Sequence, residues 1–139
     1  MTIQLQKLSD DEFDFTLEGA QVSYVGIGAQ FDIYIHDTTP MVLKITISTP
    51  FRVGESEDSL GEPIDPEKDD PRLPGLILRL RRKVLEQCHV DPGGTLKLRF
   101  DDGLVMIVAP DPEYEAWELD HAKFKIVGAA GGELAIWDR

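Results

Sequence analysis

Apolar and polar residues alternate along most of this chain, which is the pattern of β-strands that bury one face. Residues 104–108 are instead apolar on both faces, as expected of a central strand, and Asp102-Gly103 before them is typical of a tight hairpin turn. The pattern predicts a mostly β protein of the α+β class. The clearest alternating segments are residues 13–17, 31–36, 41–47 and 96–100.

Two stretches of the chain resemble each other. Residues 29–50 and residues 94–112 share the order strand, turn, strand and a closing proline. Extending the comparison backwards aligns residues 22–27 with residues 84–90. We therefore expect one antiparallel three-strand meander in each half of the chain. An internal duplication and a chance similarity between hairpins both explain the match.

The chain has 139 residues, the size of one domain with a substantial core. We expect a single domain, 1–139, with a first meander at 13–51 and an acidic, proline-rich loop at 52–74. The remainder, 75–139, is expected to hold one short helix, the second meander and C-terminal strands. The residues expected to line one core are Ile33, Leu43, Ile45, Leu98, Phe100, Met106 and Val108.

The helix is expected where leucines recur at a spacing of four after Pro74. We predict a short helix from about Leu73 to Arg81, followed by a strand from Lys83. The alternative is a helix that runs on to Cys88, which leaves residues 82–90 open between helix and strand.

The net charge of the chain limits the classes of partner that it can bind. It carries 26 acidic and 14 basic residues, a net charge of −12. Nucleic acid and an anionic membrane surface are disfavoured because the charges repel. A basic protein or a cation is the favoured partner class, and an acidic surface that only maintains solubility is the alternative.

Half of this charge lies in one loop. Residues 55–72 contain eight acidic side chains, two basic ones, several prolines and no aromatic residue. We expect the segment to be mobile or extended over the surface. It is either a flexible connector or an acidic docking surface.

Several kinds of chemistry are absent from the sequence. Cys88 is the single cysteine, there is no asparagine for N-glycosylation, and neither a signal peptide nor a membrane-spanning stretch is found, so a cytoplasmic protein is expected. His36, His89 and His121 are scattered, and we expect surface or capping roles for them. Metal, nucleotide and phosphate motifs are missing, so we expect no cofactor, no metal site and no enzymatic activity.

The C-terminal part combines aromatic residues with acids. On a strand, Glu115 and Trp117 would share one face, and a buried Glu115 would need Arg81 or Arg99 as a donor. A buried, hydrogen-bonded indole is the default for Trp117, and a surface anchor for a partner is the alternative.

The sequence YEAWEL at residues 114–119 and the ending GGELAIW at 131–137 resemble an uncharacterised bacterial family, a domain of unknown function frequent in actinobacteria. The stretches TLKLRFDDGLVMIV and LKITISTPF also fit that family, whereas a glycine is expected where Leu80–Lys83 stand. The resemblance implies a fold without an accepted activity. Members with similar endings resemble immunity proteins that neutralise secreted bacterial toxins.

Our leading hypothesis is a small binding protein, similar to immunity proteins, that engages a basic protein such as a toxin through acidic surface. The alternative is a sensor or enzyme with a small-molecule pocket between the two meanders, lined by Glu115, Trp117 and an arginine. Self-association through exposed sheet edges is a third hypothesis. The candidate partner-binding residues are Glu57, Asp58, Asp69, Asp70, Tyr114, Glu115 and Trp117.

Overall fold

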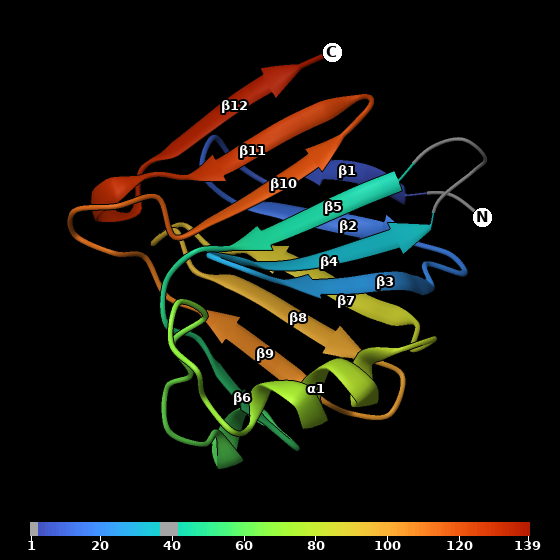
Figure 1. Ribbon diagram of the computed structural model, residues 1–139. Helices are drawn as coiled ribbons and strands as arrows, with labels where there is room; N and C mark the ends of the chain where they lie inside the picture. Colours follow the sequence, from blue (N-terminus) through green and yellow to red (C-terminus); the bar gives the residue numbers. More distant parts are fainter. Residues whose placement is uncertain (1–2, 37–41) are drawn as a thin grey trace.

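The computed structural model describes residues 3–36 and 42–139 and shows two six-stranded antiparallel sheets packed face to face (Figure 1). Sheet I has the strand order β1-β2-β7-β8-β9-β6, and sheet II has the order β12-β11-β10-β5-β4-β3. The predicted mostly β, α+β fold is therefore confirmed. The strands of sheet I are β1 (Ile3–Lys7), β2 (Phe13–Leu17), β7 (Leu85–Val90), β8 (Leu96–Phe100), β9 (Val105–Val108) and β6 (Arg52–Gly54). The strands of sheet II are β3 (Val22–Ile27), β4 (Phe31–His36), β5 (Val42–Ile47), β10 (Trp117–His121), β11 (Phe124–Gly128) and β12 (Leu134–Asp138).

Both predicted meanders are present, and they belong to different sheets. The first lies at one edge of sheet II, and the second lies in the middle of sheet I. Strands β3, β4 and β5 are consecutive neighbours in sheet II, and β7, β8 and β9 are consecutive neighbours in sheet I. The chain changes sheet after β2, after β5 and after β9. The chain therefore crosses between the two sheets three times.

Two boundaries differ from the prediction. The strand at 13–17 pairs with β7 through Phe13 and Val90, so it belongs to the sheet of the second meander and not with the first. The segment 52–74 begins with strand β6, which pairs with β9, and is not a loop throughout. Strand β1 was not predicted, and Met41, expected to start the third strand, lies outside the described residues.

Helix α1 (Leu73–Leu80) confirms the short helix. Pro74 lies in its first turn, and Arg82, with a φ of 62°, turns the chain into strand β7, which excludes the alternative helix to Cys88. The helix buries three leucines, contacts β3 of sheet II, and donates hydrogen bonds from Arg79 to Glu55 and Asp102 beside sheet I. It thereby closes one open side of the sandwich. None of the helices in the described ranges is long and apolar enough to cross a membrane.

The core lies between the two sheets. All seven residues predicted to line it are fully buried in one cluster. Ring contacts link the layers directly, with centroid distances of 5.4 Å between Phe31 and Phe51 and 5.5 Å between Phe15 and Phe124. Cys88 is also fully buried, and its burial raises the pKa of the thiol. Residues of both meanders thus belong to one core cluster, together with residues of the other strands.

The acidic loop extends over the surface, as one of the two expectations had it, but it is also attached to this core. Its carboxylates are largely exposed as predicted, but Ile64 is fully buried. The backbones of Ile64 and Phe51 exchange two hydrogen bonds, of 2.7 and 2.9 Å. One apolar residue among the acids is enough to fix the middle of the loop.

We expect Phe100→Ala or Ile45→Ala to lower the free energy of unfolding by about 2 to 5 kcal/mol, because each removes a fully buried side chain and leaves a cavity. Denaturant titration measures the loss. A neutral result for either variant would contradict the core described here.

Candidate functional site

Three connecting segments meet at one end of the sandwich and form a cleft of about 680 Å³, which we call the acidic cleft. The first segment follows β5, the second belongs to the acidic loop, and the third joins β9 to β10. A turn residue before β4 completes the wall. The lining residues are Gln30, Ser48, Thr49, Pro50, Asp65, Glu67, Asp111, Tyr114 and Glu115.

The segments of the acidic cleft are held by local hydrogen bonds. The carboxylate of Asp111 accepts the backbone N–H groups of Glu113 and Tyr114 at 2.9 and 3.0 Å, which folds this stretch into a tight turn. The carboxylate of Asp65 accepts the N–H of Glu67 at 3.0 Å in the same manner. The carboxylates at these two turns therefore have fixed positions at the rim.

The acidic cleft concentrates negative charge. Four carboxylates line it, those of Asp65, Glu67, Asp111 and Glu115, and no basic side chain is among the lining residues. Within the described residues neither Glu67 nor Glu115 forms an ion pair. The cleft is thus an unneutralised acidic site.

Two further side chains give the acidic cleft recognition groups of other kinds. Tyr114 is 66% exposed, so its ring is open to a ligand. Thr49 is only 8% exposed, and its hydroxyl is buried without a hydrogen-bond partner in the described part of the chain. Buried polar groups are normally hydrogen-bonded, so this buried hydroxyl is an exception among the described residues.

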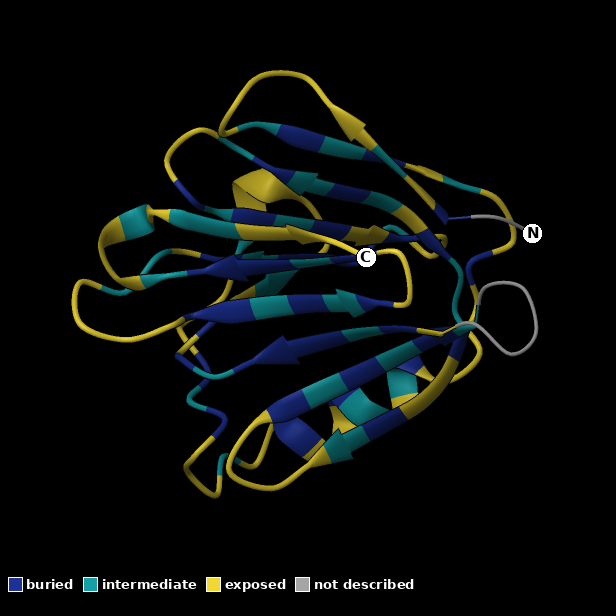
Figure 2. Cartoon of the chain, turned by 90° about the horizontal axis from the view of Figure 1, so that it is seen from above, coloured by how far each residue is buried: buried dark blue, intermediate teal, exposed yellow. Residues whose placement is uncertain are grey.

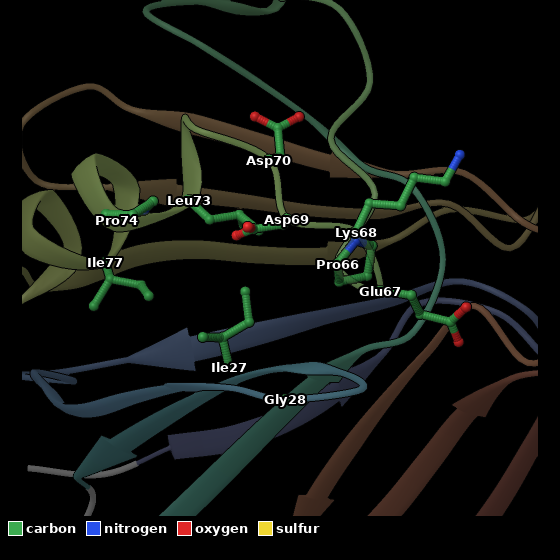
Figure 3. A pocket seen from close by; sticks show the side chains of 10 residues that line it. All are labelled: Ile27, Gly28, Pro66, Glu67, Lys68, Asp69, Asp70, Leu73, Pro74 and Ile77. Carbon is green, nitrogen blue, oxygen red and sulfur yellow. The ribbon is translucent and has the colours of Figure 1, made fainter.

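A second pocket of about 310 Å³ lies next to the acidic cleft and shares Glu67 with it (Figure 3). We call it the apolar pocket after Ile27, Leu73 and Ile77, and the charged residues Lys68, Asp69 and Asp70 line it as well. Ile27 and Gly28 from the end of β3 form one side, and residues 66–77 of the loop and helix form the other. In Figure 3 the carboxylate of Glu67 points away from Ile27 and Ile77. The two hollows therefore form one continuous surface of acidic and apolar character.

Arg72 holds the acidic loop in shape beside the apolar pocket. Its guanidinium binds both carboxylate oxygens of Asp70, at 3.0 and 2.7 Å, and donates to the carbonyl oxygens of Glu62 and Pro63. The hydrogen bonds from Arg72 lower the pKa of Asp70 from 3.8 to about 2. Asp70 is thereby engaged internally, while Asp69 stays exposed at the pocket.

The predicted site residues are divided among three places. Tyr114 and Glu115 line the acidic cleft, and Asp69 and Asp70 line the apolar pocket next to it. Glu57 and Asp58 lie elsewhere, in the short 3₁₀ helix Glu57–Ser59, where Glu57 forms an ion pair with Lys97. The loop acids thus do not form one surface.

Trp117 has the buried, hydrogen-bonded indole that was the default expectation, and the alternative of a surface anchor, which placed it among the candidate partner-binding residues, is wrong. The side chain is 1% exposed, and its indole N–H donates to the carbonyl of Gly94 at 2.9 Å. Glu115 lies before strand β10 and is exposed, so it does not share a buried face with Trp117 and needs neither Arg81 nor Arg99. The predicted pocket lined by both residues is therefore not formed.

His121 is not on the surface, but it fits the expected capping role in the turn between β10 and β11. It is buried, stacks on the ring of Phe124 at 4.8 Å, and accepts a hydrogen bond from the Lys123 N–H through Nδ1. Across the described ranges no group of three or more histidine, cysteine or acidic side chains is arranged to hold a metal ion.

Sequence reasoning named two of the nine residues that line the acidic cleft and missed the other seven, among them Thr49, Asp65, Glu67 and Asp111. Asp65 and Glu67 were counted in the acidic loop but were not distinguished from their neighbours. Asp111 could have been noticed as a turn residue within Pro110-Asp111-Pro112. No local signal marks Thr49, because its position depends on how the loops meet.

Comparison with known proteins gives a family and nothing more specific. The profile of a family described as a family of unknown function, DUF6188, matches residues 13–138. No curated protein and no solved structure shows significant similarity.

We expect the carboxyl group of Asp70 to titrate near pH 2 in the folded protein, and at a higher pH in an Arg72→Ala variant, which loses the guanidinium but keeps the backbone N–H that also bonds to this carboxylate. Because the folded pKa is lowered, the stabilisation by this pair is present above about pH 3.8 and is lost as the pH falls through about 2. NMR titration of the side-chain carboxyl measures the shift. Arg81→Ala is the control and should leave it unchanged; an unchanged pKa in Arg72→Ala would refute the assignment.

We expect Gly128→Ala to destabilise the fold by about 1 to 3 kcal/mol, because the added Cβ would lie 2.5 Å from Nε1 and 2.9 Å from Cδ2 of the buried Trp117 ring. Thermal unfolding with tryptophan fluorescence measures the loss. The matched control is Gly75→Ala in α1, where nothing lies within 4 Å of the added atom and stability should stay the same or rise. Equal stabilities for both variants would contradict the tight contact.

Proposed function

The chain belongs to the DUF6188 family of unknown function, and on that premise we propose that it is a small binding protein that recognises a basic segment of another protein in the acidic cleft. The observation that carries the proposal is the convergence of four carboxylates on one hollow without a basic side chain among its lining. Such a site attracts cationic side chains and gains most from binding them.

The chemistry of the acidic cleft favours lysine or arginine side chains over a free metal ion. The carboxylates line the rim but do not form a compact ligand set within the described residues. The exposed ring of Tyr114 offers a face on which a cationic side chain can stack.

The neighbouring apolar pocket adds a second requirement for the partner. Its wall contains Ile27, Leu73 and Ile77, and Glu67 joins it to the acidic cleft. A segment with an apolar side chain near a basic one can use both hollows together. A purely basic peptide uses only one of them.

We further propose that the basic partner is a toxin and that the chain acts in the cytoplasm as an immunity protein without catalysis. Support comes from the sequence resemblance described above and from the net charge of −12. An acidic inhibitor that covers a cationic active site binds quickly and discriminates against other partners, because its charges complement those of the target.

The test uses a synthetic peptide rich in arginine and leucine, with a control peptide that has glutamine in place of each arginine. Glu67→Gln combined with Glu115→Gln should slow association of the arginine peptide by about tenfold at low salt. The matched control is Glu18→Gln combined with Glu86→Gln, which removes the same charge from two exposed positions that line neither hollow. Biolayer interferometry measures the rates.

Charge steering also predicts slower association at higher ionic strength, because charges are screened beyond about 8 Å at 0.15 M salt. The control protein should behave like the wild type at every salt concentration. Equal binding of both peptides, or equal rates for all three proteins, would overturn the proposed site.

A further inference from the structure

Strand β12 (Leu134–Asp138) forms one outer edge of sheet II, and its hydrogen-bonding pattern is fixed by the residues at its two ends. The N–H of Arg139 donates to the carbonyl of Lys123 at 3.0 Å, and the N–H of Ala129 donates to the carbonyl of Glu133 at 2.8 Å. In an antiparallel pair, directly opposed residues alternate between bonded and non-bonded positions. Residues 133, 135, 137 and 139 therefore bond to β11, and Leu134, Ile136 and Asp138 direct their N–H and C=O groups outward.

The edge at β12 lacks the protection that the other sheet edges have. Helix α1 contacts β3, which also carries an irregularity between Val22 and Tyr24. The short strand β6 is covered by Leu60 and Gly61. Strand β1 has glutamines and Lys7, which discourage strand addition.

Strand β12, in contrast, exposes apolar side chains. Ile136 is 38% and Trp137 is 50% exposed, and Figure 2 shows this strand as a largely exposed element beside the C-terminus. The strand contains no lysine, proline or bulge. Such an edge is a template for another strand.

We propose that β12 pairs with β12 of a second copy of this chain, antiparallel and with the two-fold axis at Ile136. This register places Ile136 opposite Ile136 of the second copy and Leu134 opposite its Asp138. All residues with outward backbone groups then face each other, and each of these pairs exchanges two hydrogen bonds. The register is thus dictated by which groups the edge leaves unpaired.

The side chains between these positions are complementary in the same register. Trp137 lies opposite Ala135 of the second copy, a large residue against a small one, and Glu133 lies opposite its Arg139. These non-bonded pairs are the ones whose side chains approach most closely. A register centred on Asp138 would oppose two like charges, and one centred on Leu134 would place Ile136 opposite Gly132.

The net charge of −12 does not prevent this approach, because the edge itself is nearly neutral. Residues 123–139 carry three basic side chains, Lys123, Lys125 and Arg139, and two acidic ones, Glu133 and Asp138. Arg139 already binds Asp120, so Glu133 of the second copy extends an existing ion pair. Since one strand edge buries less area than a standard interface, the dimer is weak and depends on concentration.

The experiment measures the molar mass of the full chain by sedimentation velocity from about 1 μM to about 1 mM. The wild type should approach twice the chain mass of 15.6 kDa at the upper end. Ile136→Pro removes only an outward N–H, which an edge strand tolerates, and should keep the protein monomeric. Ile136→Val keeps the hydrogen bonds and should dimerise like the wild type.

The matched control is Lys7→Pro at the edge of β1. The Leu8 N–H bonds to the Glu12 carbonyl, so by the same alternation the N–H of Lys7, one residue earlier, points outward. This variant should still dimerise. Amide hydrogen exchange of the wild type gives a second measurement that needs no variant to fold: the N–H groups of residues 134, 136 and 138 should be protected at high concentration and should exchange quickly at low concentration.

A wild type that is monomeric over the whole range would overturn the proposal. Loss of the dimer in Lys7→Pro but not in Ile136→Pro would also overturn it, because another edge would then form the interface. The proposal would also be overturned if amide exchange at residues 134, 136 and 138 did not depend on protein concentration.

Discussion

The inner faces of the two sheets must bury each other, and this mutual burial determines where every other feature of the molecule lies. The chain satisfies it by changing sheet three times, after β2, β5 and β9. The connections after β5 and β9 reach the same end of the sandwich, where Ser48 donates its backbone N–H to the carbonyl of Ala116. The acidic cleft lies at this junction, so its shape depends on the connections that cross between the two sheets.

Charge and packing cooperate in the acidic loop. A segment with so many carboxylates would be expected to repel itself into solvent, yet Ile64 inserts into the core and Arg72 gathers three acceptors from the loop around one guanidinium. These contacts within the chain order the loop. The hydrogen bond from the Glu67 N–H to the Asp65 carboxylate adds a local turn where the loop reaches the acidic cleft.

Strands could be predicted from the sequence because alternation is a local property, and so could the helix that ends before Arg82. Sheet membership could not, because the pairing of Phe13 with Val90 joins residues far apart in the chain and competes with equally good local hairpins. The burial of Trp117 depends on two glycines that reach it only after both sheets have formed. The carbonyl of Gly94 accepts the indole N–H, and Gly128, without a side chain, leaves room for the ring. The acidic cleft was predicted in part, through Tyr114 and Glu115, but Thr49 and Asp111 enter it only through tertiary contacts.

The buried thiol of Cys88 can report on transient openings of this fold. The chain has one cysteine, and its side chain lies in the core with a raised pKa, so a thiol reagent in solution has nothing to modify while the sandwich is closed. Alkylation can proceed only during openings that expose β7. When modification is faster than reclosing, the rate of labelling under native conditions therefore reports how often β7 becomes exposed, and no substitution in the protein is needed.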